Sequence, residues 1–140
     1  MTKPNGYLSD EPTSKRMSKV RPLDTTPERV VRSLVTGLGR RYRLHRHDLP
    51  GRPDLVFARS RKVILVHGCF WHRHQGCKRC TTPARNAELW REKFARTVAR
   101  DVRNLAALGE QGWRVLVVWE YETTDAGALR MRLAAFLSEA

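Results

Sequence analysis

Acidic residues, cysteines and long apolar runs are all scarce in this 140-residue sequence. Only 14 acidic residues oppose 27 basic ones, and the formal charge of +13 favours a polyanionic partner, most commonly DNA or RNA. The longest apolar runs, such as VLVVW, have five residues and cannot cross a bilayer. Since no apolar signal segment is readable at the N-terminus either, we expect a protein of the cytoplasm, associated with the nucleoid and without a membrane partner.

The three cysteines all lie within the stretch HGCFWHRHQGCKRC, which also carries three histidines. Clustered cysteines in a reducing compartment bind metal more often than they form disulfides. Four residues follow the pattern C-x4-H-x2-C-x2-C, which suits a closed tetrahedral Zn²⁺ site: Cys69, His74, Cys77 and Cys80. We therefore expect a small zinc knot that fixes an irregular segment with few core contacts.

The composition divides the chain into an arm and one domain. Residues 1–22 are polar and basic, so we expect a flexible arm that can follow a phosphate backbone; a tail without a role is an equally good interpretation of its first ten residues. Residues 23–140 are expected to form a single domain. The sequence predicts a helix in TTPERVVRSLVTGLG, strands in RYRLHRH, DLVFA, KVILV and WRVLVVW, and helices at 86–111 and 125–140. This order, with DLVFA and KVILV as a hairpin, predicts an α/β fold in which helices flank a mixed β-sheet.

The predicted hairpin brings an acidic residue to a histidine. Asp54 stands at the head of one strand and His67 at the end of the next, so both lie at one edge of the sheet. A carboxylate there suits Mg²⁺, and a metal so held can bridge a scissile phosphate and a water. Taken alone, Pro-Asp before a strand is more often a simple turn. The company of Glu28, His67 and His72 favours the catalytic interpretation.

Asp101 lies inside an apolar stripe of the long predicted helix. At 100° per residue it falls about 20° from Trp90. A carboxylate in such a stripe needs a partner, because burying it alone costs several kcal/mol. A histidine is one candidate, since a carboxylate fixes the tautomer of an imidazole; a nearby arginine is the other.

Two groups of side chains in the same region suit contact with DNA. Phe70 and Trp71 directly follow a strand; such a pair usually caps a core, but apolar wedges also unstack DNA, most easily at a mismatch. Basic residues recur at helical spacing on the long helix, where they either contact phosphates or form a solvated face: Lys93, Arg96, Arg100 and Arg103.

Four segments together resemble the very-short-patch-repair DNA mismatch endonuclease family: TSKRMSKVRPLDTTPE, LPGRPDLVF, VILVHGCFWHRH and GWRVLVVWE. The resemblance runs from about Thr13 to Glu120, and HGCFWH is its most specific part. It implies a restriction-endonuclease-like fold. It also implies an Mg²⁺-dependent endonuclease that nicks one strand 5′ to the thymine of a T:G mismatch left by deamination of 5-methylcytosine.

The resemblance also implies roles for individual residues. It makes Asp54 the acidic Mg²⁺ ligand, with the main-chain carbonyl of Val66 as a second ligand. It makes His72 the base or proton shuttle near the phosphate, places His67 and Glu28 in the same site, and pairs Asp101 with His72. It further identifies three intercalating aromatic residues: Phe70, Trp71 and Trp90.

The chain departs from the family pattern at one proposed zinc ligand. The family usually takes its fourth ligand from a cysteine just after the WE of the last strand, and this chain has Tyr121 there. We expect Cys80 to replace it.

These observations predict a monomeric mismatch endonuclease that acts on double-stranded DNA, with mismatch-repair factors as further partners. Two alternatives stay open at this point: a restriction-type or other nuclease of the same fold with a different target, and a non-catalytic zinc-stabilised DNA-binding module.

Overall fold

A mixed four-stranded sheet lies at the centre of the computed structural model, which describes residues 25–74 and 81–139. The strands are β1 (Arg43–Leu44), β2 (Leu55–Phe57), β3 (Lys62–His67) and β4 (Arg114–Trp119), in the order β1-β2-β3-β4. β2 pairs antiparallel with β1 and with β3, whereas β3 and β4 are parallel. The predicted hairpin and mixed sheet are therefore confirmed. The predicted arm at 1–22 lies outside the described residues.

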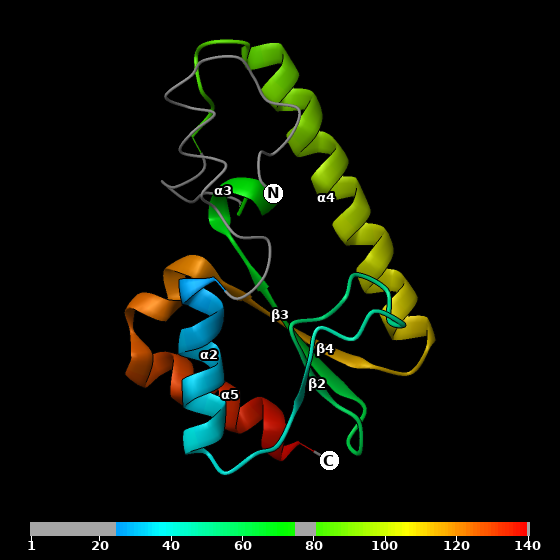
Figure 1. Cartoon of the computed structure of the whole chain (residues 1–140), viewed down its shortest axis with the longest axis vertical. Helices are drawn as coiled ribbons and strands as arrows, with labels where there is room; N and C mark the ends of the chain where they lie inside the picture. The colour runs from blue at the N-terminus through cyan, green and yellow to red at the C-terminus, as the bar shows by residue number, and fades with distance from the viewer. Residues whose placement is uncertain (1–24, 75–80, 140) are drawn as a thin grey trace.

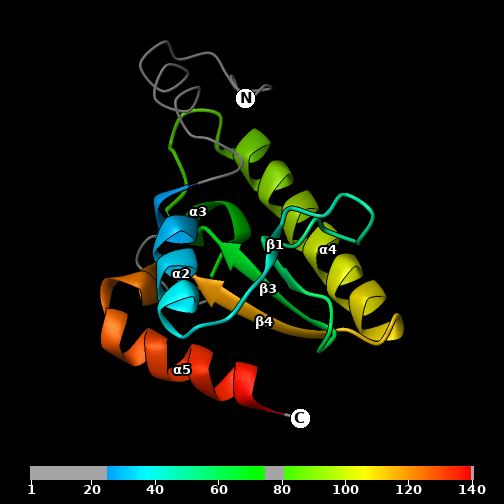
Figure 2. The ribbon, with the colours of Figure 1, turned by 60° about the horizontal axis from the view of Figure 1, so that its bottom comes forward.

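Helices cover both faces of this sheet (Figures 1 and 2). α2 (Thr26–Gly37) and α5 (Ala126–Ser138) pack on one face, and α4 (Ala87–Glu110) packs on the other. Because side chains alternate along a strand, Ile64 of β3 enters the cluster under α2 and α5, while Val63 and Leu65 enter the cluster under α4. β3 is thus buried on both faces and is a rigid support for the residues at its end.

α4 is the crossover that joins the parallel strands β3 and β4, and it is longer than the sheet requires. Its 24 residues make a rod of about 36 Å. Leu108 near its C-terminal end is buried against the sheet. The N-terminal end projects past the sheet toward the short helix α3 (Cys69–His72), as Figure 1 shows.

Two segments differ from the sequence-based expectation. The predicted strand RYRLHRH is reduced to Arg43–Leu44, because His45 adopts a left-handed conformation (φ 47°) that ends the extended chain. The segment after β3, expected to be irregular, forms α3, where the N–H of buried Cys69 donates to Glu120 Oε1 (3.2 Å). Glu120 belongs to the 3-10 helix η1 (Glu120–Thr124), which the sequence analysis does not predict. Within the described residues, no helix is both long and apolar enough to span a membrane.

Candidate active site

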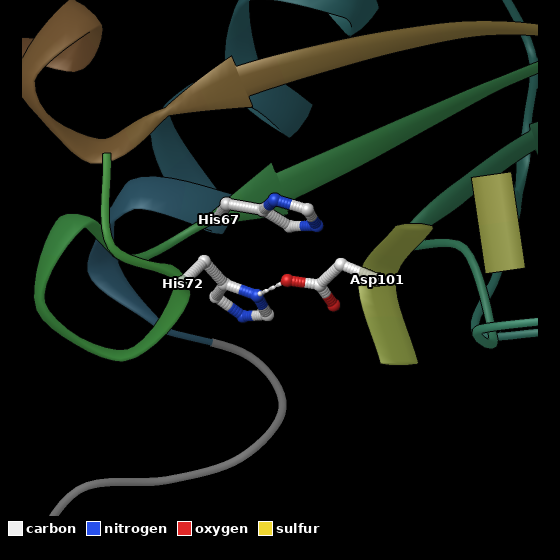
Figure 3. Close-up of side chains that lie close together, drawn as sticks. All are labelled: His67, His72 and Asp101. Carbon is white, nitrogen blue, oxygen red and sulfur yellow. Dashed lines mark hydrogen bonds and ion pairs between the residues drawn. The ribbon is translucent and has the colours of Figure 1, made fainter. Parts of the chain in front are cut away.

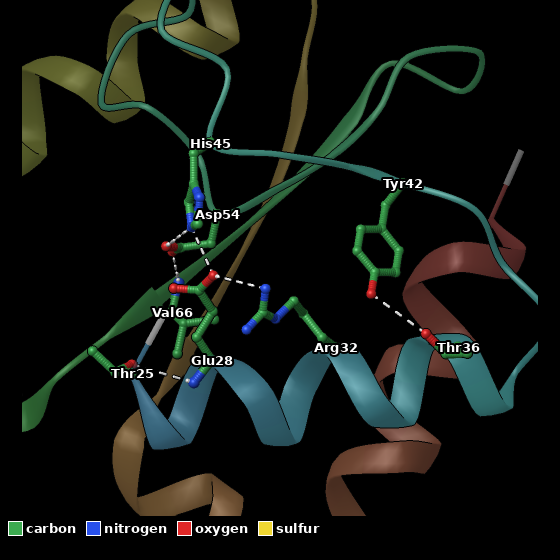
Figure 4. Close-up of polar contacts among 8 residues, drawn as sticks. All are labelled: Thr25, Glu28, Arg32, Thr36, Tyr42, His45, Asp54 and Val66. Carbon is green, nitrogen blue, oxygen red and sulfur yellow. Dashed lines mark hydrogen bonds and ion pairs between the residues drawn. The ribbon is translucent and has the colours of Figure 1, made fainter. Parts of the chain in front are cut away.

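Glu28, His45 and Asp54 form a tight polar group beside the C-terminal end of β3 (Figure 4). Glu28 lies in the first turn of α2, where Thr25 Oγ1 accepts its N–H (3.4 Å), and its side chain is only 2% exposed. His45 Nε2 lies 2.6 Å from Glu28 Oε2 and 3.9 Å from Asp54 Oδ1. Three elements far apart in sequence therefore bring two carboxylates and one imidazole together.

The register of the β2–β3 hairpin places Asp54. Leu55 pairs with Ile64, so the residue before Leu55 lies beside the last residues of β3. There Asp54 Oδ2 accepts a hydrogen bond from the Val66 N–H (2.6 Å). Because the N–H and C=O of one residue point to the same side of a strand, the Val66 carbonyl also faces the side on which Asp54 lies. This agrees with the pairing of Asp54 and Val66 that the family resemblance implies.

Burial raises the pKa of Asp54 to about 7. The neighbouring Glu28 raises it further, whereas the hydrogen bond from the Val66 N–H acts in the opposite direction. Two carboxylates taken from water beside one another repel, and a cation between them would relieve that repulsion. The oxygen donors and the imidazole nitrogen together fit a divalent cation.

A second group, His67, His72 and Asp101, lies at the end of the same strand (Figure 3). The two imidazoles stack with ring centroids 3.9 Å apart and planes 7° from parallel. His72 Nδ1 lies 2.6 Å from Asp101 Oδ2, so the expected contact with histidine is present. An ionised carboxylate accepts the Nδ1 proton, which leaves Nε2 of a neutral His72 to accept another.

His67 is held neutral. Burial, and secondarily the neighbouring His72, lower its pKa to about 4. Its side chain is buried, and Nδ1 has no hydrogen-bond partner within residues 25–74 and 81–139. The sequence predicts a single site for four of these residues: Glu28, Asp54, His67 and His72. The structure arranges them as two neighbouring groups, joined through the consecutive residues Val66 and His67.

The aromatic residues expected to contact DNA pack together. Phe70 contacts Trp71 and Trp90, with ring centroids 5.1 and 5.9 Å apart, and Trp71 lies 5.8 Å from Trp90. Phe94 completes this cluster on α4. Phe70 and Trp71 are half-buried, whereas Trp90 is only 3% exposed, so Trp90 reaches DNA only if the cluster opens.

This aromatic cluster corrects the expectation that the segment after β3 has few core contacts. Few apolar residues flank this segment in the sequence, but Trp90 and Phe94 of α4 pack on it in the fold. Arg73 adds to them: its guanidinium lies 3.8 Å from the centroid of the Phe94 ring and donates to the carbonyls of Phe70 (3.1 Å) and Thr81 (2.9 Å). The segment is therefore packed by side chains, whether or not a metal also holds it.

Only half of the expected zinc site lies in the described residues. Cys69 is fully buried, and the His74 N–H donates to its carbonyl (3.2 Å). Cys77 and Cys80 lie outside the described residues. Tyr121 stacks on the His74 ring, with centroids 4.7 Å apart and planes at 20°, and Trp119 packs on the same ring at 4.5 Å.

The basic residues of α4 lie along its surface. Lys93 is half-buried, and the side chains of Arg96, Arg100 and Arg103 are exposed. Their exposure is consistent with phosphate contact and equally with a solvated face.

His45 is the residue of this site that the sequence analysis missed. No local motif marks it. The signal available was the pairing of the predicted strands RYRLHRH and DLVFA, which brings a histidine to Asp54; the His45 N–H indeed donates to the Asp54 carbonyl (3.3 Å).

Asp54→Asn should stabilise the protein at pH 8 in buffer without added divalent cations. Because the pKa is higher in the folded chain than its ordinary value of 3.8, folding is favoured by the protonated carboxyl. That stabilisation is complete below pH 3.8 and is lost as the pH rises through about 7. The variant avoids the loss, so its unfolding free energy at pH 8 should exceed that of the wild type by up to about 4 kcal/mol, and the gap should narrow toward pH 4. Urea unfolding at several pH values measures it.

Asp48→Asn is the matched control, because Asp48 is exposed and its pKa is lowered by the hydrogen bond from Arg46. It should not stabilise the protein at pH 8. If Asp54→Asn and the wild type had equal stability at every pH, burial would not destabilise the ionised form of Asp54.

Comparison with known proteins agrees with this geometry. The chain matches the family described as DNA mismatch endonuclease Vsr over residues 7–79. It is 49% identical over 130 residues to the type II nicking enzyme V.XorIIP of Xanthomonas oryzae pv. oryzae, covering 93% of this chain and 95% of that protein. It is 47% identical over 107 residues to the DNA mismatch endonuclease Vsr of Escherichia coli, covering 76% of this chain and 68% of that protein.

A solved structure supports the fold independently. The catalytic domain of the homing endonuclease I-Bth0305I is similar over 81% of this chain and 94% of that domain, with a TM-score of 0.56 and 22% sequence identity. At that identity the likeness concerns the fold alone. The extent and identity of the sequence matches show that the chain belongs to the Vsr family of DNA mismatch endonucleases and is a DNA-cleaving hydrolase.

Proposed function

We propose that this endonuclease nicks one strand of a duplex 5′ to the thymine of a T:G mismatch, by Mg²⁺-assisted hydrolysis of the phosphodiester. One observation supports this proposal most. The carboxylates of Glu28 and Asp54, which could bind a cation, and the His72–Asp101 pair lie at the same end of β3. Because the chain is an endonuclease, the remaining alternative concerns its target: a restriction-type or other nuclease of the same fold with a different target.

Glu28 and Asp54 would hold the cation, with the Val66 carbonyl on the same side of β3. A divalent cation there supplies charge stabilisation at the phosphate and a more acidic bound water. His72 accepts or returns a proton at Nε2, because its Nδ1–H donates to the carboxylate of Asp101. His67 is neutral and stacks flat on His72, so it orients that ring without adding a competing charge.

The surface supplies binding to the duplex. The formal charge of +13 and the side chains of Lys93, Arg96 and Arg100 attract the phosphates and set register without reading sequence. Phe70 and Trp71 are the residues for a wedge at the mismatch, since they are only partly buried. Insertion at a mismatch is favoured because unstacking a mismatched base step costs less free energy than unstacking a paired one.

We also propose that Cys69, His74, Cys77 and Cys80 hold a structural Zn²⁺. Their types and spacing support this proposal, together with the hydrogen bond that brings His74 back to Cys69 (3.2 Å). These four residues complete a tetrahedral site, so the proposal needs no ligand from Tyr121, whose ring stacks on His74.

Strand-labelled duplexes with a T:G mismatch, with a G:C pair, and the corresponding single strand test the target in the presence of Mg²⁺. We expect one nick, 5′ to the thymine, in the T:G duplex alone. Asp54→Asn should abolish nicking while DNA binding persists, because it removes a cation ligand without removing positive charge. Asp48→Asn makes the same chemical change on an exposed side chain and should nick normally. Cleavage of the G:C duplex at a fixed sequence would favour the restriction-type alternative.

His72→Ala should slow nicking by roughly 10²-fold or more, the scale for loss of a general base. Asp101→Asn should slow it less, because it only releases the imidazole. Asp101 acts through His72, so the double variant should be no slower than His72→Ala alone. Glu110→Gln, at the exposed end of α4, is the control. Losses that simply multiply in the double variant would contradict the proposed pair.

Metal analysis of freshly purified protein should find one zinc per chain, with three sulfurs at about 2.3 Å and one nitrogen at about 2.0–2.1 Å. Cys80→Ser should lower zinc retention, as should Cys69→Ser. Tyr121→Phe keeps the aromatic stack on His74 and should keep the zinc. A protein that retains its zinc without Cys80 would show that another ligand completes the site.

A further inference from the structure

His45 lies beside Glu28 and Asp54, the two carboxylates proposed to bind a cation, although no sequence motif points to it. One ligand atom of His45, one of Glu28 and one of Asp54 all lie within 4.8 Å of one another. The His45 and Asp54 side chains are each 15% exposed, and that of Glu28 is 2% exposed. An imidazole nitrogen is thus enclosed with the two carboxylates that would hold a cation.

The separations suit ligands of one ion. In an octahedron with bonds of 2.0–2.1 Å, adjacent ligand atoms lie about 3 Å apart and opposite ones about 4 Å apart. His45 Nε2 is 2.6 Å from the Glu28 oxygen and 3.9 Å from the Asp54 oxygen. These two separations are close to those expected between atoms that share one cation.

The backbone is arranged for this placement. His45 takes a left-handed conformation (φ 47°), which is uncommon for a residue other than glycine. This turn directly follows β1. The hydrogen bond from the His45 N–H to the Asp54 carbonyl fixes the turn to the segment that precedes β2. Figure 4 shows the resulting imidazole directed at Glu28 and Asp54.

We propose that His45 is a nitrogen ligand of the cation held by Glu28 and Asp54, and that it makes the site prefer Mn²⁺ to Mg²⁺. The proposal rests on the proposed function, in which these carboxylates bind a divalent cation. Mg²⁺ keeps its water and favours oxygen ligands, whereas Mn²⁺, although the weakest binder of the first-row series, accepts an imidazole nitrogen more readily than Mg²⁺ does. Binding would replace the present contact between Nε2 and Glu28, and the neutral imidazole would present its Nε2 lone pair to the metal.

One competing interpretation uses the same contact. In this interpretation His45 only donates a hydrogen bond to Glu28, whose same oxygen also forms an ion pair with Arg32 at 4.0 Å. In that case His45 positions a ligand without touching the cation, and the nitrogen contributes nothing to the choice between Mn²⁺ and Mg²⁺.

Pulsed electron paramagnetic resonance of Mn²⁺ bound to the full-length protein separates the two interpretations. A nitrogen ligand modulates the Mn²⁺ signal, and this measurement needs no DNA. We expect nitrogen modulation in the wild type and its loss in His45→Gln. Glutamine keeps a polar group that can reach Glu28 but offers no imidazole. The His45→Gln comparison also excludes modulation from His67 or His72, which the variant retains.

Equilibrium titrations with Mn²⁺ and with Mg²⁺ complete the test. His45→Gln should weaken Mn²⁺ binding by about tenfold or more, the lower range for disturbing the shell of a bound metal, while Mg²⁺ binding changes little. His47→Gln is the matched control, because His47 is exposed and two residues away; it should change neither affinity.

The outcomes distinguish the inference from the function beneath it. Mn²⁺ bound without nitrogen modulation, or an unchanged ratio of Mn²⁺ to Mg²⁺ affinity in His45→Gln, would overturn the role of His45 alone. If Asp54→Asn leaves the binding of both cations unchanged, the carboxylates are not the cation site, and the proposed function falls with the inference.

Discussion

The hydrogen bond from the Val66 N–H to Asp54 Oδ2 sets the position of the first polar group of this site. It joins the start of β2 to the end of β3 just past the last pair of the hairpin. With this contact made, Asp54 is held in a region where its charge is costly, since burial is the main cause of its raised pKa. Glu28 and His45 can then gather around it from α2 and from the turn after β1. Burying the charge of Asp54 costs free energy, and a bound cation would offset that cost; the position therefore suits a cation.

β3 gives this arrangement its rigidity. Hydrophobic clusters lie on both of its faces, and β4 pairs along its whole length. The two polar groups therefore depend on one strand that is fixed by the core. Val66 serves the carboxylate group, and His67, the next residue, stacks on the histidine that follows in α3.

Much of the fold follows from sequence periodicity, and part of the site does too. The apolar runs of β3 and β4 have no other stable place than a buried sheet, and 100° per residue correctly puts Asp101 on the inward side of α4. The position of His45 beside Glu28 and Asp54 was not predicted, because it depends on the left-handed backbone of His45 and no local motif marks it; only the pairing of two predicted strands pointed to it. The packing of α3 was not predicted for another reason. Its apolar neighbours, Trp90 and Phe94, are distant in sequence and contact α3 only in the folded protein.

α4 is continuous from Ala87 to Glu110, and this continuity has a mechanical consequence. Trp90 and Phe94 touch the aromatic residues of α3 near one end, and Leu108 is anchored in the core near the other. Asp101 lies between them, about two turns beyond Phe94. Because the helix is continuous, a displacement of its aromatic end would also displace Asp101, the carboxylate that contacts His72. α4 thereby links the packing of the aromatic cluster to the contact between Asp101 and His72.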